Sequence, residues 1–148
     1  MAATAWAFYH QAKHKIGIGD INLSADSFRL ALYKSAATNP AETKTLSNQT
    51  QISNQASGGA YTTNGEALAG PTGTTTATSV QKFDATDLVI TASGSAISAV
   101  KYGVILKSLS ATGGYLLCYS QLSTSPFDVT SGNTLTIQMA TGGIFTLA

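Results

Sequence analysis

The segment from Phe83 to Leu106, FDATDLVITASGSAISAVKYGVIL, is the part of the sequence that most restricts the fold. Two runs rich in β-forming residues, Leu88–Ala92 and Ile97–Leu106, lie on either side of Gly94. Such residues favour strands, and a glycine between two such runs is typical of a turn. The segment therefore predicts two consecutive strands of a β-sheet.

Further strand patterns occur at intervals of about 8–12 residues, with glycine turns between many of them. In Phe28–Lys34 the large apolar side chains alternate, as expected for a half-buried strand. The remaining predicted strands are an edge strand in Thr72–Val80 and the segments Tyr115–Leu122, Thr134–Met139 and Ile144–Leu147. Strands do not alternate with helices, which disfavours a parallel sheet. The sequence predicts an all-β fold, a β-sandwich or jelly roll of antiparallel sheets with a short N-terminal helix.

Residues 1–20 are predicted to form a helical arm ahead of the strands. Thr4 is a suitable N-cap for a helix over Thr4–Lys15, in which apolar side chains recur at spacings of three and four. Gly17 and Gly19 favour the end of that helix. Because the arm lies outside the predicted sheets, removal of its first ten residues is expected to leave the β-fold intact.

The arm carries a dense group of aromatic residues, Trp6, Phe8 and Tyr9. Such a helix either covers the open end of a sheet or anchors the chain to a neighbouring subunit, because aromatic side chains dominate interface hot spots. These three residues, together with Tyr61, are the candidate protein-interface residues of the sequence.

Residues 35–78 are rich in Ser, Thr, Asn, Gln, Ala and Gly and hold few large apolar residues. A structureless loop of this length is uncommon inside a compact domain. The segment is therefore either a set of weak edge strands or a long excursion that a partner orders. Within it, Asn64 and Gly65 form a typical two-residue hairpin turn, which would pair Ala60–Thr63 with Glu66–Ala69.

Charged residues make up only 10% of the 148-residue chain, against about 25% in ordinary globular proteins. A surface of hydroxyls and glycines costs less to desolvate than one of lysine and glutamate, so the composition favours a chain that works in contact with other protein. The length suits a single β-sandwich domain, residues 1–148, whose core requires neither a metal nor a disulfide.

The charge and hydropathy patterns exclude two classes of partner. Net charge is +1 and the eight basic residues are scattered, unlike the clustered basic face that binds nucleic acid. Apolar runs reach four or five residues, far below the ~20 needed to span a bilayer. The N-terminal sequence has no apolar block behind a cationic segment, so we expect no signal peptide.

His10 and His14 are the only histidines, and the spacing of four is one that zinc-binding helices use. Position 11 is glutamine where such a site has a glutamate, and no third ligand is nearby, so we expect no metal here. Asp84 and Asp87 supply only part of a calcium loop, and they lie far in sequence from the single tryptophan that a glycosidase cleft would use. Their expected role is to cap a turn.

Cys118 is the only cysteine, which excludes an internal disulfide and fits synthesis in a reducing cytoplasm. Its place in YLLCYSQL predicts a small buried side chain rather than a nucleophile. The sequence contains no G-x-S-x-G motif and no complete dinucleotide-binding glycine motif. We therefore expect no catalytic residue, no cofactor and no metal, and a protein that is not an enzyme.

The order of four segments resembles that of a group of small tailed-bacteriophage virion proteins. The segments are KIGIGDINLSADSFRLALYKS, SGGAYTTNGEALAG, FDATDLVITASGSAISAVKYGVIL and the ending GGIFTLA. In that group a short N-terminal helix leads to an "INL..D.F..AL" strand, a glycine-rich hairpin, a "Y.VIY" strand and a final "IF.L" strand. The resemblance spans nearly the whole chain, which departs from it at Ala60 and Glu66, where the group commonly has glycines.

The resemblance implies a structural component of the virion, of the head decoration or cement type. Such a protein would bind the major capsid protein on the outer surface of the head, assemble with its own copies as a dimer or trimer, and be made in the host cytoplasm. Neither nucleic acid nor membrane would be its partner. The alternative is a tail or fibre adaptor, or a receptor-binding module, with a ligand site on its surface.

Overall fold

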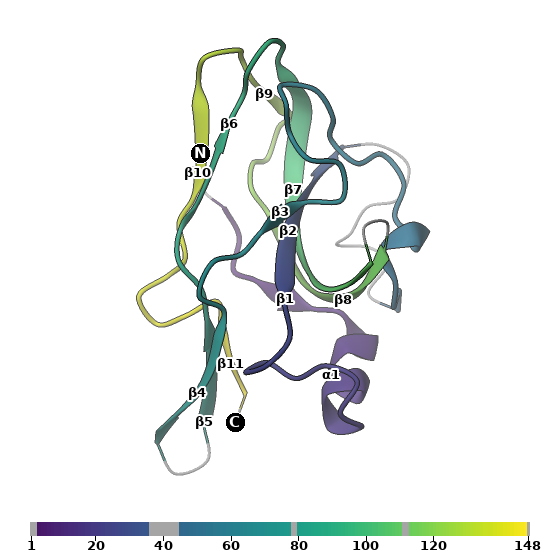
Figure 1. Cartoon of the computed structure of the whole chain (residues 1–148), viewed down its shortest axis with the longest axis vertical. Coiled ribbons are helices and arrows are strands. Elements are labelled where there is room, and N and C mark those ends of the chain that lie inside the picture. The colour runs from purple at the N-terminus through teal and green to yellow at the C-terminus, as the bar shows by residue number, and fades with distance from the viewer. Residues whose placement is uncertain (1–2, 36–44, 78–79, 111–112, 148) are drawn as a thin grey trace.

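The chain folds into a sandwich-like all-β structure, as the strand patterns predict (Figure 1). The computed structural model describes residues 3–35, 45–77, 80–110 and 113–147. In chain order the elements are β1 (Ala7–Phe8), α1 (His10–Gly17), β2 (Phe28–Lys34), η1 (Gln49–Gln51), β3 (Glu66–Ala67), β4 (Thr72–Ala77), β5 (Val80–Asp84), β6 (Leu88–Thr91), β7 (Ile97–Ser110), β8 (Gly113–Gln121), β9 (Phe127–Val129), β10 (Thr134–Ile137) and β11 (Phe145–Leu147).

The main sheet has the strand order β1-β8-β7-β2-β3, and β9 also pairs with β7. All of these pairings are antiparallel. The long strand β7 lies between β2 and β8, so its backbone is paired on both sides. The strands predicted over Phe28–Lys34 and Ile97–Leu106 are confirmed as β2 and β7, with β7 continuing to Ser110.

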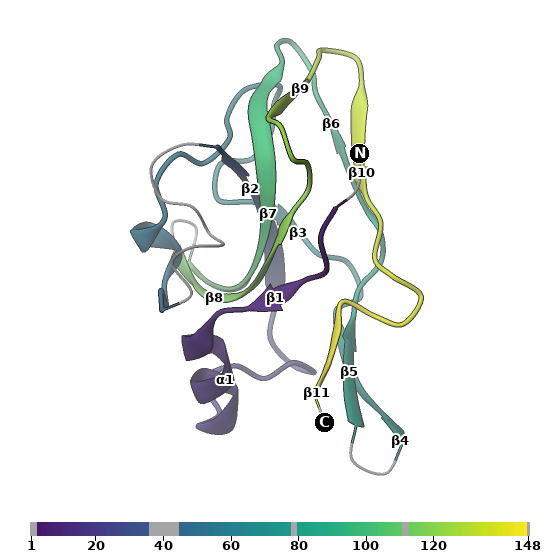
Figure 2. The ribbon, with the colours of Figure 1, turned by 180° about the vertical axis from the view of Figure 1, so that it is seen from behind.

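Two smaller antiparallel sheets, β10-β6 and β11-β5-β4, form the second layer. Figures 1 and 2 show them end to end along one side of the main sheet. The strands predicted from position 88 onward are confirmed as β6, β8, β10 and β11. β4 is an edge strand, as predicted, but it ends at Ala77, and Val80 begins β5, an unpredicted strand that pairs with β4. Positions 78 and 79 lie outside the described residues.

Four of the five phenylalanines form a row that joins the two layers. Phe28 of β2 meets Phe83 of β5 with ring centroids 4.9 Å apart. Phe83 stacks on Phe145 of β11 at 5.1 Å, and Phe145 meets Phe8 of β1 at 4.3 Å. Aromatic pairs of this kind add about 0.5–1.5 kcal/mol each to the burial of their apolar surface. The row therefore ties both ends of the chain to the core.

The prediction of a helix from Thr4 is wrong: the chain is extended up to Tyr9, and α1 begins at His10. Thr4 N donates to Gln121 O at 2.9 Å, and Thr4 Oγ1 accepts from Gln121 N at 3.0 Å. β1 then pairs with β8. Helices this short are marginal by themselves, so pairing of the aromatic-rich segment with the edge of the sheet outweighs its helical pattern. The predicted end of the helix is confirmed, at Gly17.

Residues 45–77 of the polar segment are packed on their own chain and contain the edge strands β3 and β4. The described part therefore fits the first of the two predicted alternatives, a set of weak edge strands. Positions 36–44 lie outside the described residues. The predicted pairing of Glu66–Ala69 with Ala60–Thr63 is wrong, because Glu66 and Ala67 pair with β2. A Cβ at Gly65 would lie 2.7 Å from Leu30 O, so the missing side chain lets the turn approach β2 closely.

The half-buried character predicted for Phe28–Lys34 is also wrong, because both faces of β2 are covered. Ala31 and Tyr33 are as buried as Leu30 and Leu32. The polar segment lies against this strand: Ala56 N donates to Leu32 O at 2.8 Å, and Gln55 forms a bridge with Tyr33. Alternation in one strand cannot show that a distant segment packs on its polar face.

Tyr9 has no exposed surface and contacts Tyr119 with ring centroids 5.2 Å apart. Replacing a fully buried aromatic residue by alanine leaves a cavity, so Tyr9→Ala should lower the free energy of unfolding by about 3–5 kcal/mol. Urea unfolding followed by circular dichroism measures this loss of free energy of unfolding.

The exposed neighbour His10 provides the control, and His10→Ala should change the free energy by less than about 0.5 kcal/mol. Removal of the first ten residues should destabilise the fold for the same reason, in contrast to the expectation from sequence. An unchanged unfolding midpoint for Tyr9→Ala would contradict this account of the N-terminal segment.

Candidate interaction surface

The structure separates the four candidate interface residues into two groups. Tyr9 and Tyr61 are buried within the chain, and Tyr61 Oη accepts a hydrogen bond from Leu32 N at 2.8 Å. Phe8 is half-buried against Phe145 in the phenylalanine row. Trp6 is half-buried and lines an open pocket. Contact of these four residues with another subunit stays a prediction. Of the four, Trp6 and Phe8 keep the exposed surface that such a contact needs.

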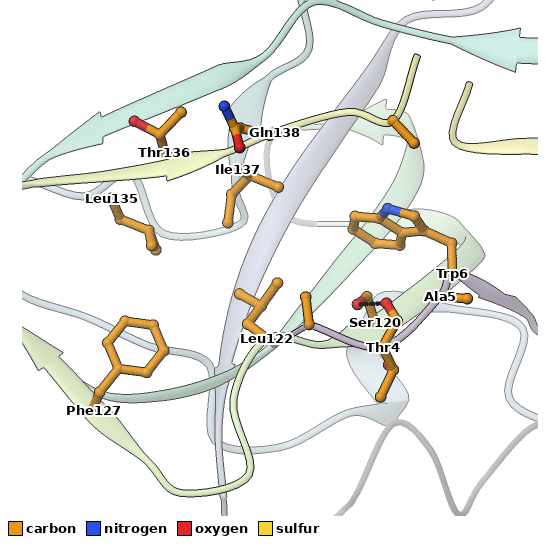
Figure 3. A pocket seen from close by; sticks show the side chains of 12 residues that line it. Thr4, Ala5, Trp6, Ser120, Leu122, Phe127, Leu135, Thr136, Ile137 and Gln138 are labelled. Atoms are coloured by element: carbon orange, nitrogen blue, oxygen red, sulfur yellow. Dashed lines mark hydrogen bonds between the residues drawn. The ribbon is translucent and has the colours of Figure 1, made fainter. Parts of the chain in front are cut away.

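The pocket that contains Trp6 lies at the seam between the two layers and has a volume of about 570 Å³. Figure 3 shows the Trp6 indole at one end, Phe127 at the other and Leu122 between them. We call this pocket together with its neighbour, described below, the seam groove. Its first part is lined by Ala3, Thr4, Ala5, Trp6, Ser120, Leu122, Phe127, Leu135, Thr136, Ile137, Gln138 and Ala140.

Local backbone pairing positions Trp6 over the main sheet. Ser120 Oγ donates to Thr4 O at 2.7 Å, which fixes the extended segment that carries the indole beside β8. A Cβ on Gly103 of β7 would lie 3.5 Å from both Trp6 Cη2 and a Leu122 methyl group. The missing side chain at Gly103 therefore lets the indole and Leu122 approach the strand closely.

The neighbouring pocket extends the seam groove along β10. It has a volume of about 360 Å³ and shares Phe127 and Leu135 with the first. Asn133 and Thr134 line its far end, and Ala140 lines the first pocket. The seam groove therefore follows the whole of β10.

The seam groove is almost free of charge. None of the residues that line its first part is ionisable, and Asp128 is the single charged residue of the second. One Asp128 oxygen is already engaged, since it accepts a hydrogen bond from Ala99 N at 2.7 Å. The lining combines apolar side chains with hydroxyls and the Gln138 amide, so it suits an uncharged, partly apolar occupant.

A second apolar surface lies near α1. Ile18 and Leu109 are 58% and 48% exposed. Lys107 Nζ donates to Asp20 O at 2.6 Å and pairs with Asp26 at 2.8 Å, which holds the chain after α1 against β7. Ile18 and Leu109 lie two residues from Asp20 and Lys107, so they belong to the same end of the molecule. We call them the α1-end pair.

The residues considered for chemistry are not gathered into a site. His10 and His14 are exposed on α1. Asp84 pairs with Lys82 at 2.8 Å, and Asp87 accepts a hydrogen bond from Met139 N at 2.7 Å. The Asp87 bond joins two segments 52 residues apart and is not the predicted turn cap, whereas Asp84 accepts a local hydrogen bond from Ala85 N at 2.9 Å. Among the described residues, no group of three or more His, Cys, Asp or Glu side chains could hold a metal ion.

Burial shifts the pKa values of ionisable groups in the core. Cys118 is completely buried, as its alternation predicts, and burial raises the pKa of its thiol well above the usual value. Such a thiol is a poor nucleophile at neutral pH. Burial also raises the pKa of Tyr33 to about 12, and the neighbouring Gln49 side chain acts in the opposite direction.

The chain matches no family model, no curated protein and no solved structure. In the part of the chain that is described, no helix is long and apolar enough to cross a membrane. The virion assignment therefore depends on the sequence resemblance and on the surfaces above. Sequence reasoning singled out Trp6, but it did not find the rest of the seam groove, whose other walls lie more than a hundred residues away along the chain.

The buried Tyr33 phenol predicts a loss of stability at alkaline pH. Its pKa in the folded state is about 12, against 10 in the unfolded chain. Since burial penalises the phenolate, the contribution of Tyr33 is fully present below about pH 10 and is lost as pH rises toward 12. We expect the free energy of unfolding, measured with urea, to fall between these pH values.

Tyr33→Phe should make that fall shallower, because the variant has no phenol to ionise. Identical pH dependences for Tyr33→Phe and the unchanged protein would show that this phenol does not contribute.

Proposed function

We propose that the protein is a bacteriophage capsid decoration protein, which binds the outside of the head lattice and stabilises contacts between major capsid proteins. The observation that carries the proposal is that this small chain bears an open, mostly apolar seam groove. Contiguous apolar surfaces of this kind mark sites of protein contact. The exposed side chains of the α1-end pair supply further apolar area for contact with a lattice.

Low charge supports the same function. Only 10% of the residues are charged, so contact surfaces of this chain can be desolvated without separating many ions from water. A head under internal pressure is held by many weak contacts between coat subunits. A small protein that bridges two or three of them adds buried apolar area across their boundaries, which raises the free energy needed to separate them.

The alternative is a tail or fibre adaptor, or a receptor-binding module. The side chains of Trp6 and Phe127 at opposite ends of an open pocket favour this alternative, since a few aromatic groups around polar ones are typical of ligand sites. Copy number in purified particles separates the two functions. Decoration requires a number comparable to that of coat subunits, whereas an adaptor or fibre is present in few copies.

The decoration function predicts that the α1-end pair contacts the head. Ile18→Asp and Leu109→Asp each place a charge in a contact that the proposal treats as apolar, and both should weaken binding by about tenfold or more. Co-sedimentation of purified protein with empty heads, over a range of protein concentrations, measures the change.

Val89→Asp is the matched control, because Val89 is 57% exposed on β6, away from α1. This variant should bind as the unchanged protein does. Equal binding by all three variants would contradict the assignment of the α1 end, and failure of the unchanged protein to bind heads would contradict the decoration function itself.

A further inference from the structure

The strand that borders the seam groove has an unpaired edge. Within the described residues β10 pairs only with β6. Asn133 O accepts a hydrogen bond from Ala92 N at 2.9 Å, so the alternation of an antiparallel ladder directs Leu135 and Ile137 backbone groups toward β6. The N–H and C=O groups of Thr134 and Thr136 then point outward. No described residue bonds to them.

This edge also lacks the features that usually prevent strand association. Exposed edges are commonly protected by charged side chains, proline, bulges or short length. Thr134–Met139 contains no charged residue and no proline, and the pairing of β10 with β6 has no register shift. Among the other edges, β1 and β3 have two residues each, and Gly73 O on β4 accepts a hydrogen bond from Ser24 Oγ. Within the described residues β6 also pairs only with β10, but no β6 residue lines the seam groove.

The seam groove has the shape that an added strand requires. It follows β10 along its length, between the Phe127 and Trp6 side chains (Figure 3). A strand paired with the outer edge of β10 would direct every second side chain into the groove. Apolar side chains at alternate positions therefore fit there, because the walls are mostly apolar and uncharged.

We propose that the occupant is a second copy of the chain, whose β10 pairs antiparallel with β10 about a twofold axis. β10 itself carries apolar side chains at alternate positions: Leu135, which keeps exposed surface, and Ile137, which is buried in its own chain, both line the groove. Since β10 holds no charged residue, the two paired strands place no like charges opposite each other. The result is a continuous four-stranded sheet, β6-β10-β10-β6, from two copies.

The hydrogen-bonding parity of the ladder fixes the register. The outward groups of Thr134 and Thr136 must bond to the same groups of the second copy, so the centred pairing sets Thr134 opposite Thr136. Leu135 then lies beside the axis, opposite Leu135 of the second copy, in a non-hydrogen-bonded pair. Such pairs have the shortest separation between Cα atoms, about 4.5 Å, which lies within the range of a disulfide.

This inference deepens the proposed function by naming the surface through which copies associate. The biological purpose of the dimer rests on the proposed function, whereas the dimer itself does not. The experiments use the purified full chain without heads, so their failure would remove the dimer and leave the head-binding result unaffected.

The first experiment is a disulfide cross-link. Cys118 is completely buried, so a cysteine introduced at position 135 supplies the reactive thiol. We expect Leu135→Cys, oxidised at low protein concentration, to form a covalent dimer on a non-reducing gel. Val89→Cys is the control: Val89 is more exposed, at 57%, and lies on β6, so random collision would favour its cross-linking. Cross-linking of both variants alike, or of neither, would overturn the proposal.

The second experiment measures association directly. Sedimentation equilibrium of the unchanged protein should give a reversible monomer–dimer equilibrium, and Leu135→Lys should raise its dissociation constant by about tenfold or more, because two lysines would face each other. Val89→Lys should leave the constant unchanged. A monomer at the highest concentration the protein tolerates, or a trimer, would overturn the proposal even if Leu135→Lys failed to fold.

The single tryptophan reports on the same surface. Trp6 lines the groove that the second copy would fill, so dilution of the unchanged protein through its dissociation constant should increase quenching of its fluorescence by acrylamide. Quenching that does not change on dilution, but decreases when empty heads are added to a monomer, would assign the groove to the head instead and overturn the dimer.

Discussion

The row of Phe28, Phe83, Phe145 and Phe8 is the interaction on which the rest of the structure depends. It links the main sheet to the second layer and fastens β1 and β11 to the same point. In a chain with few charged residues, apolar contact is the main force available to hold two layers together. The salt bridges of the described residues involve partly exposed side chains, and such pairs contribute little.

The position of this row also explains why the seam groove exists. The row closes the sandwich beside β5 and β11, whereas the fifth phenylalanine, Phe127, and the single tryptophan line the groove beside β10 (Figure 3). There the second layer has only two strands, β6 and β10, and the N-terminal segment covers one end of the gap. A small domain that ends a layer with a free, uncharged strand retains a surface suited to another chain, which connects the architecture with the proposed assembly in a virion.

Much of the strand content followed from local pattern, because β-branched runs and turn glycines restrict a chain wherever they occur. β2 matches its predicted bounds, and β6, β7, β8, β10 and β11 fall within or close to the predicted segments. Most of the errors concern a segment whose partner is distant in sequence. Thr4–Tyr9 has a helical pattern but pairs with β8, and Glu66 and Ala67 pair with β2. The strand predicted over Thr72–Val80 is a local exception, since it divides into the adjacent strands β4 and β5.

For the candidate site, too, local properties could be predicted from the sequence and contacts between distant segments could not. Composition and spacing alone determined that the protein is all-β, weakly charged, and rich in aromatic residues near its N-terminus, because these properties are local or additive along the chain. Only the tertiary structure decided that Tyr9 and Tyr61 are core residues, that Phe8 belongs to the phenylalanine row, and that Trp6 faces Phe127 across an open groove. The physical reason is that burial and pocket geometry arise from contacts between segments that a period of two or 3.6 residues cannot connect.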